Sequence, residues 1–189
     1  MSVFDLKKYR ILIILIGLAI CFPIIIFSCN FVLRIIYPLH YEAIIEKYSE
    51  EYDLDILFVA SVIRAESSFD VDAISPKDAR GLMQIANITG RWAAEELDIP
   101  NYNEEMLFNP DVNIRIGCWY LDKLRKEFDN NISNVLAAYN AGSGNVNKWL
   151  ANEKYSPNGE DLIEIPFGET REYIKRVNRN YKMYTYLYR

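Results

Sequence analysis

The stretch LDILFVASVIRAESSFD, residues 54–70, decides the fold class. It is apolar on nearly every side from Leu54 to Ala65, and a helix that is hydrophobic all round is buried. The run is too short to cross a membrane, so we expect a core helix. Asp53 is expected to cap its amino end. The run ends in a carboxylate, Glu66, so the sequence predicts an acid at the end of a buried helix.

The rest of the chain from Tyr41 onward also favours helices, and strand signals are weak everywhere. Asn109-Pro110-Asp111 predicts a helix start, because it combines a capping amide, a proline at the first helical position and an acid in the first turn. Apolar side chains then recur every four residues as far as Phe128. Further helices are expected over residues 41–52, 87–97, 134–139, 146–150 and 169–186. The fold is therefore expected to be mainly α.

An uncharged apolar run of 23 residues, 11–33, precedes this domain. At about 1.5 Å per residue it spans about 34 Å as a helix, enough for the hydrocarbon core of a bilayer. Lys7, Lys8 and Arg10 precede the run, and positive charge stays on the cytoplasmic side. The expected organisation is a cytoplasmic segment over 1–10, a transmembrane helix over 11–36 and an extracytoplasmic domain over 41–189.

Two other interpretations of the N-terminal run stay open. A cleaved signal peptide has a shorter apolar region and a small-residue cleavage site, which this run does not clearly show. A lipoprotein signal would end at Cys29, because Ile26-Phe27-Ser28-Cys29 loosely resembles a lipobox. All three interpretations place the domain on the extracytoplasmic side of the cell membrane.

The histidine and cysteine content and the net charge limit which kinds of catalytic site and partner are expected. The single histidine, His40, directly follows the apolar run, and Cys21 and Cys29 lie within it. Serine-histidine triads, cysteine-histidine pairs and most zinc sites need a well-placed histidine, so we expect no metal and no cofactor. The net charge is −5 and the first 40 residues carry +3, so the remaining 149 residues carry −8. That excess of acid disfavours a nucleic-acid partner.

Glu66 is a candidate general acid. The carboxyl end of a helix carries partial negative charge, and burial disfavours a charged carboxylate. Both effects raise the carboxyl pKa, as a general acid near neutral pH requires. A glutamate at a helix end is also common without any role, so Glu66 alone does not decide the function.

Five short motifs follow Glu66-Ser67 along the chain. They are Ser75-Pro76, Gly81-Leu82-Met83-Gln84, Asn109-Pro110, Ala138-Tyr139-Asn140-Ala141-Gly142 and Ile165-Pro166-Phe167-x-Glu169-Thr170-Arg171-x-Tyr173. Together they resemble the catalytic domain of soluble lytic murein transglycosylases, relatives of goose-type lysozyme, over roughly residues 41–188. The resemblance implies a lysozyme-like helical domain. It also implies cleavage of the β-1,4 bond between N-acetylmuramic acid and N-acetylglucosamine in peptidoglycan.

The resemblance places the family's catalytic acid on Glu66. In the mechanism that it implies, one carboxyl acts first as acid and then as base, and the product is a 1,6-anhydromuramyl end. That dispenses with the second carboxylate that most glycosidases use. The resemblance also implies that Tyr139 hydrogen-bonds the Glu66 carboxyl. The substrate-binding residues that it implies are Ser75, Gln84, Tyr139, Asn140 and Glu169.

The chain departs from the family pattern at two places. Asp78-Ala79 stands where the family usually has a Gly-Ala pair. Ala86-Asn87 stands where a larger apolar residue and a proline often follow the glutamine. These changes bear on a sugar subsite and leave Glu66 untouched.

Two other functions stay open. A goose-type-like muramidase would use the same acid with water as the attacking group, and Asp70, Asp72 and Asp78 lie near enough in sequence to position that water. A non-catalytic, membrane-anchored scaffold would bind glycan without cutting it. In each case a monomer is expected, with peptidoglycan glycan strands and the membrane as partners. Cell-wall or secretion machinery is a further candidate partner.

Overall fold

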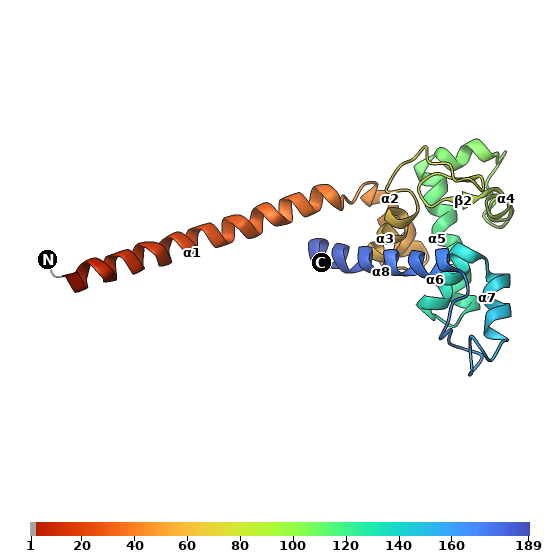
Figure 1. Ribbon diagram of the computed structural model, residues 1–189. Helices are drawn as coiled ribbons and strands as arrows, with labels where there is room; N and C mark the ends of the chain where they lie inside the picture. The colour runs from red at the N-terminus through yellow and green to blue at the C-terminus, as the bar shows by residue number, and fades with distance from the viewer. Residues whose placement is uncertain (1–2) are drawn as a thin grey trace. The chain divides into compact units, whose positions relative to one another are not determined.

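The computed structural model describes residues 3–189, in two compact units, Met1–Pro38 and Leu39–Arg189. The first unit is helix α1, Val3–Ile36 (Figure 1). Within it, Leu15–Ile36 is long and apolar enough to cross a membrane, a property that a signal sequence shares. The expected cytoplasmic segment over 1–10 lies partly outside the described residues.

The second unit is mainly helical, as expected (Figure 1). Its α-helices are α2 (Glu42–Glu51), α3 (Ile56–Glu66), α4 (Asn87–Glu96), α5 (Pro110–Glu127), α6 (Ile132–Ala141), α7 (Ser143–Leu150) and α8 (Gly168–Tyr188). A short 3-10 helix that the sequence did not predict, η1 (Glu104–Phe108), precedes α5. Strands β1 (Ala79–Arg80) and β2 (Ile85–Ala86) pair antiparallel, with Ala79 opposite Ala86. The predicted start of α5 is confirmed, because the Asn109 side chain accepts two backbone N–H groups of its first turn.

The cap of α3 is Asp55, and the expected cap at Asp53 is wrong. Asp55 Oδ1 accepts the backbone N–H groups of Leu57 at 2.8 Å and Phe58 at 3.1 Å. Asp53 instead lies in the turn that ends α2, with a φ of +51° and an exposed side chain whose Oδ2 lies 3.5 Å from the Arg125 guanidinium. The helix therefore begins two residues later than predicted, and it includes Glu66 as its last residue.

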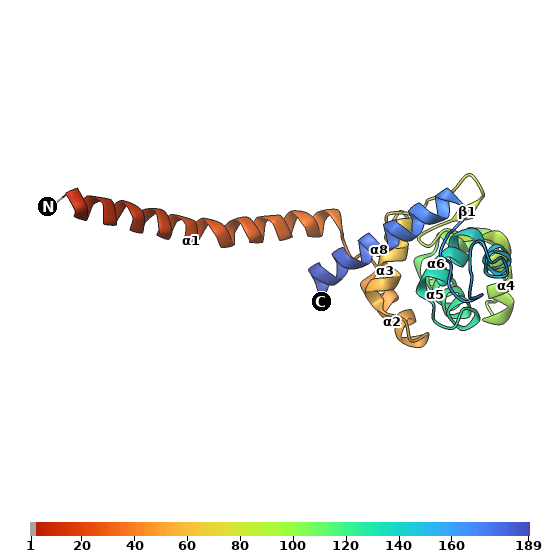
Figure 2. The same ribbon diagram turned by 60° about the horizontal axis from the view of Figure 1, so that its bottom comes forward.

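Helix α3 packs along α8, which runs antiparallel to it (Figures 1 and 2). At the start of α3, Asp55 Oδ2 accepts a hydrogen bond from Tyr181 Oη at 3.1 Å. In its middle, the Ser61 carbonyl accepts one from Asn180 Nδ2 at 3.3 Å. Because the two helices run in opposite directions, the carboxyl end of α3 lies beside the first turns of α8, and Glu66 is at that end.

Asn113, a fully buried residue of α5, fixes the Gly81–Gln84 turn. Its Oδ1 accepts the Met83 N–H at 2.8 Å, and its Nδ2 donates to the carbonyls of Arg80 at 2.9 Å and Leu107 at 2.7 Å. The glycine that opens the turn has a φ of +72°, and a Cβ there would collide with the Leu107 carbonyl. The turn therefore rests directly on α5 and carries Gln84 at a fixed position.

We expect Asp55→Ala to lower the free energy of unfolding by about 1–2 kcal/mol, because two N–H groups at the start of α3 lose their acceptor. Urea unfolding of the full chain in detergent micelles measures this change. Asp53→Asn is the control, since asparagine also tolerates a positive φ and Asp53 lies outside the cap. Equal destabilisation by the two substitutions would contradict the assignment of the cap to Asp55.

Candidate active site

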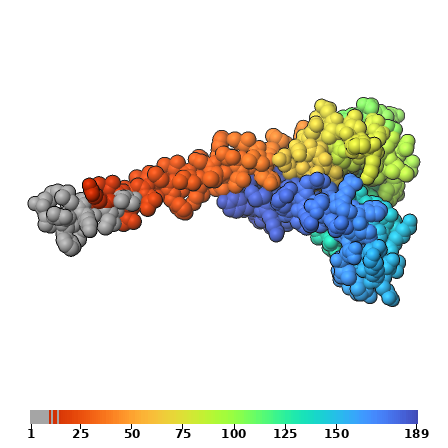
Figure 3. Space-filling model, in the orientation of Figure 1, coloured from red at the N-terminus to blue at the C-terminus, as the bar shows by residue number. Residues whose placement is uncertain are grey.

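A cleft of about 390 Å³ lies at the carboxyl end of α3. Its lining consists of Glu66, Ser75, Pro76, Lys77, Ala79, Gln84, Ala86, Tyr139, Asn140 and Glu169. The structure therefore brings the six expected site residues together from four separate segments of the chain. Figure 3 shows two of these segments, around residues 70–85 (yellow) and the C-terminal helix (blue), on the same face of the second unit.

Glu66 lies in the cleft and is partly exposed to it. Burial of the carboxyl raises its pKa from 4.5 to about 7, against smaller lowering effects from Tyr173 and the charge of Arg176. The negative charge of Glu169 adds to the rise. A large fraction of Glu66 is thus protonated at neutral pH, which a general acid requires.

The tyrosine whose hydroxyl interacts with the Glu66 carboxyl is Tyr173 of α8, and the expected bond from Tyr139 is absent. Tyr139 Oη donates its only proton to the Met83 carbonyl at 2.9 Å. Tyr173 is fully buried, and its hydroxyl lowers the Glu66 pKa. No described residue meets that hydroxyl in normal hydrogen-bond geometry, so its contact with Glu66 is long or bent. Sequence reasoning missed Tyr173 although it closes the last of the motifs.

In each of three polar residues of the cleft, one side-chain group is hydrogen-bonded within the protein and another is available to a ligand. Ser75 Oγ accepts two backbone N–H groups of its own loop, at 3.0 and 3.2 Å, so its hydroxyl hydrogen stays available as a donor. Gln84 Nε2 donates to two backbone carbonyls at 3.0 Å each, which leaves Oε1 as an acceptor. Thr170 Oγ1 donates to Asn140 Oδ1 at 2.7 Å, which leaves the Asn140 amide hydrogens.

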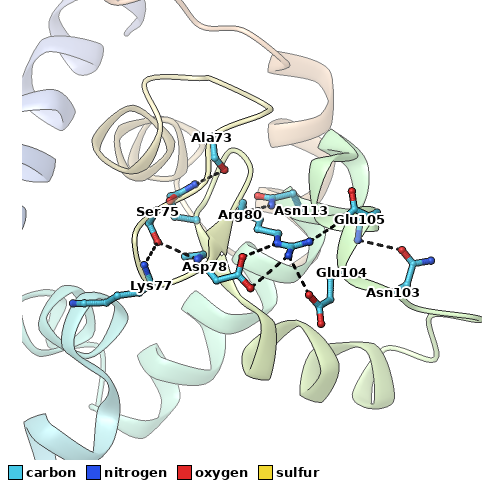
Figure 4. Close-up of polar contacts among 11 residues, drawn as sticks. Ala73, Ser75, Lys77, Asp78, Arg80, Asn103, Glu104, Glu105 and Asn113 are labelled. Carbon is cyan, nitrogen blue, oxygen red and sulfur yellow. Dashed lines mark hydrogen bonds and ion pairs between the residues drawn. The ribbon is translucent and has the colours of Figure 1, made fainter.

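The three aspartates considered for positioning a water do not line the cleft. Asp70 accepts the backbone N–H of Asp72 at 3.0 Å, and Asp78 pairs with Arg80 at 3.1 Å (Figure 4). The carboxylates of the lining are Glu66 and Glu169 alone. Among the residues that the structure describes, no group of three or more histidine, cysteine, aspartate or glutamate side chains is arranged to hold a metal ion.

The raised Glu66 pKa predicts a pH-dependent effect of Glu66→Gln on stability. As pH rises from about 4.5 to about 7, the unfolded chain releases the Glu66 proton while the folded chain keeps it, so the wild type loses stability over that range. The variant has no such proton. Relative to the wild type, it should gain about 3 kcal/mol in free energy of unfolding between pH 4 and pH 8. Urea unfolding at both pH values measures the difference, and a difference independent of pH would contradict the buried carboxyl.

We expect Tyr173→Phe to raise the Glu66 pKa further, because the substitution removes a hydroxyl whose interaction lowers it. Titration of the ¹³C-labelled glutamate carboxyls by NMR reports that pKa directly. Tyr139→Phe is the matched control, because the Tyr139 proton is committed to the Met83 carbonyl. A Glu66 pKa that falls in Tyr173→Phe, or that moves equally in both variants, would refute the assignment.

Known proteins resemble this domain in sequence. The family profile of the transglycosylase SLT domain matches residues 43–161. The soluble lytic murein transglycosylase of Escherichia coli K12 is 36% identical over 143 residues, which are 75% of this chain and 22% of that protein. Membrane-bound lytic murein transglycosylase C of Pectobacterium atrosepticum is 28% identical over 172 residues, with coverage of 76% and 46%. The chain thus spans less than half the length of either relative.

Solved structures agree. The 70-kDa soluble lytic transglycosylase of Escherichia coli has a TM-score of 0.74 and 34% identity, over 82% of this chain and 25% of that one. An inactive glutamate-to-glutamine mutant of the lytic transglycosylase Slt from Pseudomonas aeruginosa has a TM-score of 0.72 and 31% identity, with the same coverage. These likenesses confirm the expected fold, and the family profile covers more than half of the sequence. The chain belongs to the transglycosylase SLT domain family.

Proposed function

We propose that this domain is a lytic transglycosylase that cleaves the β-1,4 bond between N-acetylmuramic acid and N-acetylglucosamine in murein. One observation carries the proposal: the Glu66 carboxyl lies in a cleft and burial raises its pKa to about 7. The relatives support it, because they are described as lytic murein transglycosylases. In the Pseudomonas aeruginosa enzyme, a glutamate-to-glutamine substitution gives an inactive protein.

In the first step, protonated Glu66 donates its proton to the glycosidic oxygen, and the bond from that oxygen to the muramyl C1 breaks. Positive charge develops at C1, and the carbonyl oxygen of the sugar's own N-acetyl group stabilises it. The free Ser75 hydroxyl hydrogen and the Asn140 amide hydrogens are donors that hold such an acetamido group. The Gln84 Oε1 acceptor suits its N–H.

In the second step, the Glu66 carboxylate removes the proton of the muramyl C6 hydroxyl, and O6 closes onto C1. The product is a 1,6-anhydro ring, Glu66 is protonated again, and no water is consumed. The same carboxyl therefore acts as acid and then as base. The three nearby aspartates do not line the cleft, so a muramidase would have to position its water with Glu169, the other carboxylate of the lining.

We also propose that α1 anchors the domain in the cell membrane, with Lys7, Lys8 and Arg10 on the cytoplasmic side. The apolar segment Leu15–Ile36 is long enough for one crossing. The membrane-bound relative supports membrane association. The catalytic domain then acts on glycan close to the outer surface of that membrane, because Leu39 already belongs to the folded unit.

Incubation of the full chain, in detergent micelles, with purified peptidoglycan tests the proposed reaction. Mass spectrometry of the released muropeptides should find anhydro ends, lighter by one water than the products of hydrolysis. Glu66→Gln should lower the rate by at least about 10²-fold, the usual contribution of general acid-base catalysis. The wild-type rate should fall as pH rises through about 7, because the first step requires the protonated acid.

Glu172→Gln is the matched control, since Glu172 is an exposed residue of α8 paired with Lys175 outside the cleft. It makes the same chemical change and should leave the rate unaltered. Reducing ends in place of anhydro ends would identify a muramidase. Absence of cleavage by a folded wild-type protein that still binds the glycan would identify a binding scaffold.

A further inference from the structure

Lys77 and Glu169 lie on two different walls of the cleft and form an ion pair with each other. Lys77 belongs to the loop that follows Ser75, and Glu169 belongs to the first turn of α8. Lys77 Nζ lies 3.5 Å from Glu169 Oε2, and the two side chains are 81% and 72% exposed. Among the residues that line the cleft, Lys77 is the only basic one. Neither the sequence motifs nor the proposed mechanism gives it a role.

The backbone that carries Lys77 is held in place on both sides. Before it, Ser75 Oγ accepts the Lys77 N–H at 3.2 Å. After it, the Arg80 side chain, only 15% exposed, bonds to three carboxylates, those of Asp78 at 3.1 Å, Glu104 at 3.2 Å and Glu105 at 2.9 Å (Figure 4). The Lys77 side chain points away from this cluster (Figure 4). The loop is therefore a fixed platform for a side chain that is itself exposed.

Another carboxylate can readily replace Glu169 as the partner of Lys77. An exposed pair of this kind contributes about 0–1 kcal/mol, so a competing carboxylate can replace Glu169 at little cost. The chain beyond residue 40 carries a charge of −8, which repels acidic ligands in general. The Lys77 ammonium, the single positive charge of the cleft lining, offsets that repulsion locally and offers three hydrogen-bond donors.

We propose that Lys77 binds a carboxylate of the glycan's acidic substituent and that Glu169 occupies the ammonium only while the cleft is empty. This inference rests on the proposed function and deepens it, because it makes a charged substituent beside the cleaved bond part of what the enzyme recognises. In murein the carboxylate has two sources. One is the lactyl group of N-acetylmuramic acid when it bears no peptide, and the other is a peptide attached to that group.

Four glycan preparations test the proposal with the full chain in detergent micelles: peptide-bearing and peptide-free strands, each before and after chemical amidation of the carboxyl groups. For the wild type, amidation should raise KM about fivefold, as expected for the loss of about 1 kcal/mol, and should change kcat less than about twofold. Lys77→Met should show the high KM with every preparation. Lys77→Arg should restore the preference for free carboxylates. An effect with peptide-free strands identifies the lactyl carboxylate, and an effect confined to peptide-bearing strands identifies the peptide.

Lys175→Met is the matched control, because Lys175 forms an equally exposed ion pair outside the cleft. It should behave as the wild type. A wild type that treats free and amidated strands alike, or a Lys77→Met protein that keeps the preference, overturns the proposal. So does a loss confined to kcat, because it would indicate disturbed chemistry instead of lost recognition.

A binding measurement separates this inference from the proposed reaction. Isothermal titration of the Glu66→Gln protein with soluble fragments of the same strands requires no turnover. A roughly fivefold preference for free over amidated fragments, abolished by adding Lys77→Met, supports the role of Lys77 even where the wild type releases no anhydro product. Equal binding of both kinds of fragment overturns that role even where the wild type cuts murein as proposed.

Discussion

The antiparallel packing of α3 on α8 is the constraint on which the site depends. Asp55 fixes the amino end of α3 through its cap and through Tyr181, so the position of the last residue, Glu66, follows from the length of one rigid helix. Because α8 runs back along α3, its first turns bring Tyr173 and Glu169 to the same end. One helix pair therefore supplies the acid, the hydroxyl that moderates its pKa and a wall of the cleft.

The polar groups of this domain fall into two kinds that differ in how completely they are bonded. Asn113 is buried and uses both its oxygen and its amide hydrogens within the protein, as buried polar groups normally do. Ser75, Gln84 and Asn140 each retain one unused group, and all three retained groups belong to residues of one cleft. Incomplete bonding is costly in a core but necessary where a ligand supplies the partner. Single buried atoms elsewhere, such as Ser49 Oγ and Asn134 Oδ1, also lack a partner, but three unused groups gathered in one cleft fit a ligand-binding site.

Sequence reasoning predicted the α-helices, and the six site residues that it named lie in one cleft, but it failed where tertiary contacts choose between equivalent residues. The apolar run of α3 and the start at Asn109 are local patterns, and both appear as predicted. Asp53 and Asp55 are equally good caps on local grounds, and the turn that ends α2 takes Asp53 away. Tyr139 and Tyr173 are likewise both near Glu66, because the negative charge of Glu66 raises the pKa of each hydroxyl. Only the Met83 carbonyl, brought near by the Asn113 bonds, diverts the Tyr139 proton.

One of the two departures of this chain from the family pattern, at Asp78-Ala79, falls on the loop that carries Lys77. Asp78 stands where the family usually has glycine, and its φ is +60°. Glycine adopts this angle freely, whereas an aspartate adopts it at a cost of about 1 kcal/mol. The charged bond from Arg80 offsets that cost, and it requires an acid at this position. Asp78 and Arg80 therefore act together in this loop. Glu104 and Glu105 also pair with Arg80, and together these bonds hold the backbone that carries Lys77. Glu66 is unaffected, because it depends on α3 and α8 and not on this loop.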